Sequence, residues 1–498
     1  MHQIDREEIR KWVTAHMQDL TETLKIICRI PSVAQTEHPD AAPYGEGCKR
    51  VLRKMLRMGE EEGFTTRNYE DYVGSISYPG RGSESIGIWC HLDVVEEGKD
   101  WDYPPFEPTV KDGYMIARGC QDNKSSAAMG FYVLKYMKEH GITLDHTLEL
   151  YLGTCEEKGM YDLDYYVAHY DCPTLSLVPD SGFPVCCGER GTFNGELVGE
   201  AFVTGDVVDL TCDCGQYTIP DKARAVLRYT RERWEKCQAP GEKVEVSREG
   251  DTICIQAGGI SSQAANPAKG DSALGRLAGF VCGRKLLEER DLAVFTLAED
   301  ICQDYQGTAL GVACQDAVSG PMVLSATRLS LCEDPDGSRR PVLGFISKFP
   351  VSESEKELPD MEQIPCEADT EKEPSLVERA RKAAAKRGFL LEVTKFAKAN
   401  CFDPAHPAVQ VLTDCSNRVL GRQDAPFVMS GGTYARKLPR AFAFGTGMPL
   451  PPRPAALFRP GHGDYHQPDE SIALERIQKA LEIYIQGILE IDGLVLGK

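Results

Sequence analysis

Apolar residues recur along the chain with two periods, and these alternate in its first part. Helical spacing, stopped at Pro31 and at Gly141, predicts helices in residues 5–29, 46–62 and 123–141. Apolar or alternating runs predict strands in residues 75–78, 85–95, 146–154 and 174–181. Strands that alternate with helices are typical of an α/β protein with a largely parallel sheet.

The pattern changes after residue 188. Short predicted strands mix there with helices expected at 219–236 and 271–286. Segment 352–375 is polar and acidic, which predicts an exposed loop or linker.

The α/β pattern returns from about Ala399, with helices expected at 406–420 and from 470 to 490. We therefore expect two domains. An α/β domain would comprise residues 1–188 plus 399–498, and an inserted domain would comprise residues 189–398.

Composition narrows the possible partners. The formal net charge of −20 argues against nucleic acid and against an anionic membrane surface. The first residues, MHQIDREEIRKWV, are charged and helical and do not resemble a signal peptide. Many of the 19 cysteines lie in apolar runs, as free thiols do, so we expect a cytoplasmic protein.

Two polar residues end an otherwise apolar predicted strand. In SIGIWCHLDVV, residues 85–95, His91 and Asp93 are two apart, so their side chains share one face. Ligands of open α/β sheets bind at the carboxyl ends of strands. Taken alone, the pair is equally consistent with a core histidine bonded to a neighbouring carboxylate.

Other acids and histidines also fall where apolar strands end or helices begin. Each has a simpler interpretation, since paired glutamates are often solvated and an Asp before a helix is often a cap. Converging carboxylates would repel one another unless a cation lies among them, and His with carboxylate suits zinc. These residues are Asp122, Glu156, Glu157, Asp180, His462 and His466.

The motifs HLDVV, ARGCQDNKSSAA, GTCEEKGM, VPDSGFPV, GGTYAR and HQPDES occur in the chain in this order. They resemble the two-zinc aminoacylase/carboxypeptidase G/succinyl-diaminopimelate desuccinylase family. The most similar branch is that of the monomeric bacterial Xaa-His dipeptidases, of the carnosinase-like, dipeptidase V type. The resemblance covers nearly the whole chain and implies a zinc-exopeptidase-like domain, with a mixed, mostly parallel sheet flanked by helices, and an inserted α+β lid.

The resemblance also implies residue roles. His91 and Asp180 would hold one zinc, Glu157 and His466 would hold the other, and Asp122 would bridge them. Asp93 would support His91, and Glu156 would be the general base on the bridging water. His466 is preferred over His462 because Gln467 and, a little further on, Glu470 follow it, as in the family.

Residues for substrate binding are expected in two places. The glycines of GGTYAR would let backbone amides approach a substrate carboxylate near Gly432 and Thr433, with Arg436 as anion partner or as a structural arginine. In the lid, Gln263 stands where the family has a histidine, and Lys348 stands where an arginine is usual. Lysine cannot form the two parallel bonds that arginine makes to a carboxylate.

Smaller departures are Ser272 for an asparagine and Glu96 for a proline. We expect a monomeric hydrolase with two Zn²⁺ per chain, Mn²⁺ or Co²⁺ being possible, that cleaves a dipeptide or small peptide. One alternative is an amidohydrolase for N-acyl amino acids. Another is a metal- or ligand-binding relative of low activity, which the altered lid favours and the presence of both Glu156 and Glu157 opposes.

Overall fold

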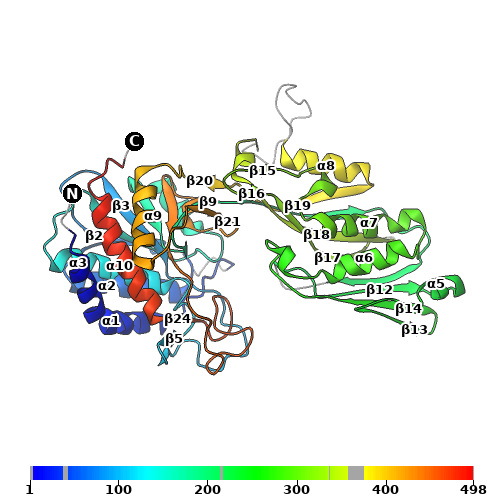
Figure 1. Cartoon of the computed structure of the whole chain (residues 1–498), viewed down its shortest axis with the longest axis horizontal. Coiled ribbons are helices and arrows are strands. Elements are labelled where there is room, and N and C mark those ends of the chain that lie inside the picture. Colours follow the sequence, from blue (N-terminus) through cyan, green and yellow to red (C-terminus); the bar gives the residue numbers. More distant parts are fainter. Residues whose placement is uncertain (1–3, 38–42, 213–216, 336, 357–374, 497–498) are drawn as a thin grey trace. The chain divides into compact units, whose positions relative to one another are not determined.

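Two large sheets, one in each of two units, organise the chain, and each unit has hydrophobic cores of its own. The computed structural model describes residues 4–37, 43–212, 217–335, 337–356 and 375–496. Its contacts divide the chain into a first unit, Met1–Gly188 with Cys401–Lys498, and a second unit, Glu189–Asn400. Figure 1 follows both units by sequence colour, from the blue N-terminal helices to the red C-terminal helix of the first unit.

The sheet of the first unit has a parallel centre and antiparallel margins. Its strands are β1 (Thr65–Tyr69), β2 (Val73–Tyr78), β3 (Ser85–His91), β6 (Thr147–Gly153), β7 (Leu175–Val178), β9 (Val185–Glu189), β20 (Asn400–Cys401), β21 (Phe427–Met429) and β22 (Ala441–Phe444). Their order is β1-β2-β6-β3-β7-β22-β9-β20, with β21 beside β9. β3 is parallel to β6 and β7, and β7 is parallel to β22.

Helices and two small sheets complete this unit. The helices are α1 (Arg6–Cys28), α2 (Glu46–Glu61), α3 (Lys124–Glu139), α4 (Tyr161–His169), α9 (Pro407–Leu420) and α10 (Leu474–Ile491). Asp5 caps α1 by accepting from the amides of Glu7 and Glu8. One small sheet pairs β24 (Ser471–Ala473), β5 (Tyr114–Ile116) and β4 (Thr109–Lys111), and the other pairs β23 (Thr446–Gly447) with β8 (Ser181–Gly182).

The alternation of strand side chains decides which face His91 occupies. Ile88 and Cys90 of β3 enter the large core formed with the helices. Trp89 enters a second, aromatic core on the opposite face, where its ring stacks on Tyr151 at 4.1 Å between centroids. His91 lies two residues after Trp89 and therefore shares this second face.

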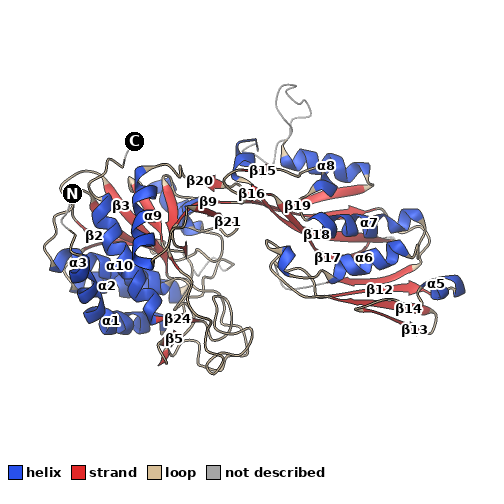
Figure 2. Cartoon of the chain, viewed as in Figure 1, coloured by secondary structure: helices blue, strands red, loops and turns tan. Residues whose placement is uncertain are grey.

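The second unit is an antiparallel sheet with helices packed against it. Its strands are β10 (Gly191–Gly199), β11 (Val207–Cys212), β12 (Lys222–Arg228), β13 (Val244–Glu249), β14 (Thr252–Gly258), β17 (Val323–Glu333), β18 (Arg339–Phe349) and β19 (Phe389–Ala397), in the order β13-β14-β12-β11-β17-β18-β10-β19. A two-stranded sheet pairs β15 (Gln315–Asp316) with β16 (Gly320–Pro321). The helices α6 (Ala273–Gly283), α7 (Glu289–Asp304) and α8 (Leu376–Lys386) pack against the sheet, as can be followed in Figure 2.

Most predicted elements are confirmed, and so is the α/β fold class, but the helix predicted at 219–236 is wrong. That segment forms strand β12 followed by the short helix α5 (Arg231–Lys236). Ala223, Ala225 and Leu227 are buried at alternate positions, and β12 pairs with both β11 and β14. Pairing on both sides overrides the helical preference of this alanine- and arginine-rich segment. The predicted polar loop at 352–375 falls mostly outside the described residues.

Two broader expectations concern the whole chain. Every cysteine among the described residues is a free thiol. Within the same residues, each helix is too short or too polar to cross a bilayer.

Candidate metal centre

Neighbouring parallel strands bring several predicted residues to one edge of the first sheet. His91 is the last residue of β3, and Asp180 comes two residues after β7. Glu156 and Glu157 lie in the turn that follows β6. Because β6, β3 and β7 are adjacent and parallel, their carboxyl ends meet.

His91, Asp122 and Asp180 form one group of ligand-type side chains. The Nε2 atom of His91 is 3.1 Å from Oδ1 of Asp122 and 3.9 Å from Oδ2 of Asp180. Asp122 lies in the loop before α3. The side-chain amide of the next residue, Asn123, donates to Oδ1 of Asp180 at 3.0 Å. Asn123 thus fixes the orientation of Asp180 relative to Asp122.

Asp122, Glu157 and His466 form a second group, so Asp122 belongs to both. The Nε2 atom of His466 is 3.2 Å from Oδ2 of Asp122 and 3.0 Å from Oε1 of Glu157. Each oxygen of Asp122 therefore faces a different imidazole. The His466 side chain is 46% exposed, so this side of the centre is open to solvent.

The electrostatics of the centre reflect this crowding. Burial would lower the pKa of His91, but its hydrogen bonds to Asp122 and Asp93 raise that pKa well above its usual value. Hydrogen bonds to Asp122 and Glu157 raise the pKa of His466 to about 10. Burial, together with the charges of neighbouring carboxylates, raises the pKa of Glu156. Protons on these groups balance a charge that a divalent cation would otherwise balance.

Asp93 is fully buried and connects the strand to the turn. Its two carboxylate oxygens accept the backbone amides of Glu156 and Glu157, each at 3.0 Å. The Nδ1 atom of His91 is 3.0 Å from the Asp93 carbonyl oxygen and 3.4 Å from its carboxylate. Asp93 therefore orients His91 and also fixes the backbone that carries both glutamates.

Glu470 and Arg118 support Asp122, and our sequence analysis assigned neither of them a role. Oε1 of Glu470 accepts the amides of Gln121 and Asp122 at 2.9 and 3.1 Å. Oε2 accepts Nη1 of Arg118 at 2.8 Å and the amide of Gly119 at 3.1 Å. Both side chains are almost completely buried. The sequence signal that could have found them is that Arg118 lies in the same motif as Asp122, and Glu470 in the same motif as His466.

The competing histidine, His462, belongs elsewhere. Its Nδ1 is 2.6 Å from Oδ2 of Asp469, whose other oxygen accepts the amides of Asp102 and Tyr103. Asp102, His462 and Asp469 form a third group of ligand type. Arg459 supplies positive charge there, because its guanidinium pairs with Asp102 at 2.7 Å.

The predicted substrate-binding residues lie in both units. In the first, Thr433 caps a short 3₁₀ turn (Tyr434–Arg436), and the Arg436 guanidinium donates to the Gly431 carbonyl at 3.2 Å. A Cβ on Gly432 would lie 3.2 Å from that guanidinium.

In the second unit, Gln263 is exposed in a loop that bridges to Thr218. Lys348 of β18 donates to the Thr192 hydroxyl at 2.8 Å. The substrate roles of all these residues stay predictions.

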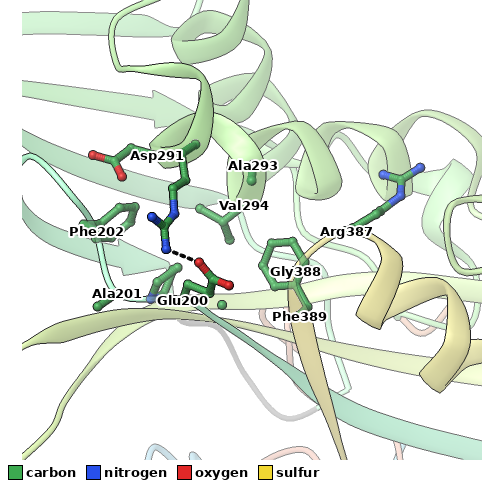
Figure 3. Close-up of a pocket in the computed structure, with 12 residues that line it drawn as sticks. Glu200, Ala201, Phe202, Asp291, Ala293, Val294, Arg387, Gly388 and Phe389 are labelled. Atoms are coloured by element: carbon green, nitrogen blue, oxygen red, sulfur yellow. Dashed lines mark hydrogen bonds and ion pairs between the residues drawn. The ribbon is translucent and has the colours of Figure 1, made fainter.

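The second unit also holds a cavity of about 130 Å³, shown in Figure 3. Its apolar lining includes Phe202, Val294 and Phe389. Two of its charged lining residues, Arg290 and Glu200, form an ion pair. Because these two charges neutralise each other, we assign no chemistry to the cavity.

Two groups of His and carboxylate ligands that share one carboxylate fit a pair of divalent cations. Oxygen and imidazole donors suit zinc and related transition metals. The residues from 87 to 490 match the model of Peptidase family M20/M25/M40. The chain therefore belongs to this family and is a peptide-hydrolysing metallopeptidase, which confirms the resemblance inferred from its motifs.

Individual relatives agree with this classification. The "Putative dipeptidase YtjP" of Bacillus subtilis is 27% identical over 486 residues, which cover 95% of this chain and 97% of that protein. The aminoacylhistidine dipeptidase of Vibrio alginolyticus has a similar structure, with a TM-score of 0.54, 14% identity and coverage of 95% and 96%. YXEP of Bacillus subtilis, described as a dinuclear metal binding peptidase, has a TM-score of 0.50, 11% identity and coverage of 97% and 100%.

Proposed function

We propose that this protein is a dipeptidase that hydrolyses the amide bond of a dipeptide or small peptide at the His91–His466 centre. One observation carries the proposal. The Asp122 carboxylate lies between the imidazoles of His91 and His466, and it forms one group with His466 and Glu157, the residue after Glu156. The relatives named as dipeptidases support this substrate class.

The chain's own residues divide the work. Glu156 takes a proton from the attacking water and passes it to the leaving nitrogen as the carbon–nitrogen bond breaks. Burial raises the pKa of Glu156, which favours the proton uptake by its carboxylate that this role requires. Asp93 holds the amide of Glu156 and so fixes the direction from which the carboxylate approaches.

Two divalent cations fit the five ligand-type residues. We propose His91 and Asp180 for one ion, Glu157 and His466 for the other, and Asp122 for both. When bound, they would polarise the scissile carbonyl and lower the pKa of the attacking water. Zinc is our first choice because of the imidazole and carboxylate donors, with Mn²⁺ or Co²⁺ as alternatives.

We also propose that residues 189–398 serve as a lid and that the 1–188 plus 399–498 part is catalytic. The lid would contribute Gln263 and Lys348 to the substrate, and the first unit would contribute Gly432, Thr433 and Arg436. The length of the inserted part favours a monomer. We expect the protein to work in the cytoplasm. Lys348 in place of an arginine keeps the positive charge but changes its geometry.

The altered lid supports a second candidate, an N-acyl-amino-acid amidohydrolase. An N-acyl amino acid has the scissile amide and the carboxylate of a dipeptide but lacks its free amino group. A panel of dipeptides and N-acyl amino acids, compared by kcat/KM, separates the two. Faster cleavage of the acylated series would replace the dipeptidase proposal without changing the metal centre.

The decisive experiment changes the two adjacent glutamates separately. Glu156→Gln should keep two metal ions per chain and lose about 10²–10⁴-fold in kcat, because only the base is removed. Glu157→Ala should lose one metal ion in addition to activity. Glu61→Gln, at the exposed end of α2, is the matched control. Full activity of Glu156→Gln, or saturation of the parent at one ion, would overturn the proposed mechanism.

A further inference from the structure

Two buried carboxylates hold four consecutive backbone amides of the turn after β6. Asp93 accepts from Glu156 and Glu157, as described above. Oδ2 of Asp162 accepts the backbone amides of the two residues that precede Glu156, Thr154 at 2.7 Å and Cys155 at 3.0 Å. Asp162 is fully buried. A backbone segment with four consecutive amides held in this way has little freedom to reorient.

Asp162 reaches the turn because the chain folds back sharply. Gly159 and Met160 have φ values of +117° and +59°, and α4 begins at the next residue. Asp162 is the second residue of that helix, and its Oδ1 accepts the amide of Leu163 at 2.9 Å. The carboxylate is therefore fixed at one oxygen by its own helix and offers the other to the turn.

Tyr434, from the GGTYAR motif, completes the arrangement from a distant part of the chain. Its hydroxyl donates to the same Oδ2 of Asp162. A Cβ on Gly153 would lie 1.9 Å from this hydroxyl oxygen, so only glycine at the end of β6 lets the tyrosine approach. The Tyr434 ring also stands edge-on to the imidazole of His91, at 6.3 Å between centroids.

We infer that Asp162 and Tyr434 are positioning residues that aim the Glu156 carboxylate at the reacting water. The inference rests on the proposed role of Glu156. Tyr434 holds Asp162, Asp162 holds the amides of Thr154 and Cys155, and the next peptide carries Glu156. A misplacement of about 1 Å in a catalytic group can cost about 10²-fold in rate. The motif GGTYAR thereby acts on the base as well as on any substrate carboxylate.

Tyr434→Phe tests the inference because it removes one hydroxyl and leaves the ring. We expect kcat of the metal-loaded enzyme to fall about 10–100-fold, with KM and the two bound ions unchanged. Backbone amides in residues 153–160 should exchange hydrogen faster. The matched control is Tyr166→Phe, in the same aromatic core, whose hydroxyl donates to the Asp171 carbonyl at 3.0 Å. It should show neither change.

Asp162→Asn provides a second measurement if Tyr434→Phe does not fold. It should lower kcat and speed exchange in the same peptide. If Tyr434→Phe matches Tyr166→Phe in kcat and exchange, the inference is wrong. The inference is also wrong if kcat of Tyr434→Phe falls only in proportion to the metal that the variant loses, because the lower activity would then come from a damaged metal centre. Glu156→Gln, measured alongside, separates the two failures: its full activity refutes the proposed function, whereas its inactivity leaves only the positioning role in question.

Discussion

Glu470 is the residue whose replacement should perturb the centre most without touching a proposed ligand. Glu470→Gln keeps the size of the side chain but leaves one acceptor oxygen instead of two. Either the Arg118 and Gly119 donors or the Gln121 and Asp122 amides then face an NH₂ group. Whichever way the amide turns, two buried donors lose their partner.

The magnitude follows from burial. The side chains of Arg118 and Glu470 are 2% and 1% exposed and lie 2.8 Å apart. Removal of one partner from a buried ion pair costs about 3–5 kcal/mol, because the remaining charge stays buried. We expect the free energy of unfolding of the first unit to fall by this amount. Loss of the acceptor for the Asp122 amide should also weaken metal binding about 10–100-fold.

Urea unfolding followed by tryptophan fluorescence measures the first effect, since three of the four tryptophans, Trp12, Trp89 and Trp101, belong to the first unit. Titration with a competing chelator measures the second. The matched control is Glu475→Gln on α10, whose exposed carboxylate pairs with Lys479 and should contribute less than about 1 kcal/mol. If Glu470→Gln unfolds within 1 kcal/mol of that control, our account of the buried pair is refuted.

Two further predictions concern other parts of the molecule. Burial and the charge of Asp93 raise the pKa of Asp162 from 3.8 to about 6, so the folded state holds this proton more tightly than the unfolded state. In metal-free protein, the stability of the parent relative to Asp162→Asn should therefore fall by about 2 kcal/mol from pH 4 to pH 7. A difference between the urea curves of the two proteins that does not change with pH would contradict this prediction. Gln263→His should raise kcat on a cleaved dipeptide at unchanged metal content, because a missing oxyanion donor costs about 10²–10³-fold in rate. If the parent, Gln263→His and Gln263→Ala have equal kcat values while chemistry limits the rate, residue 263 does not face the scissile bond.

The sequence could group the proposed ligands because most of them lie in short motifs at the end of an apolar strand or before a helix, whereas His466 lies in a loop and was assigned through the family resemblance. His91 and Asp93 share a face by strand geometry alone, and Glu157 follows a recognisable strand. Parallel strand ends meet at one edge, so residues from separate motifs could be expected together before any contact was known.

The supporting residues could not be predicted in the same way. Asp162 is indistinguishable in sequence from an acid in the first turn of a helix, a place that favours acids for other reasons. Its partner Tyr434 is 272 residues away, and Arg118 is 352 residues from Glu470. The strand β12 was missed for a related reason, because its neighbours in the sheet, and not its own residues, determine its conformation.

The order of strands in the first sheet has a consequence for synthesis. β22, formed by Ala441–Phe444, lies between β7 and β9, which the ribosome makes more than 250 residues earlier. A nascent chain that has just finished the second unit therefore has β7 and β9 without their common neighbour, and exposed strand edges of this kind invite aggregation. His466 emerges later still. The complete centre can thus assemble only after His466 has been made, so the second proposed cation would bind after the first group of ligands, His91, Asp122 and Asp180, is already present.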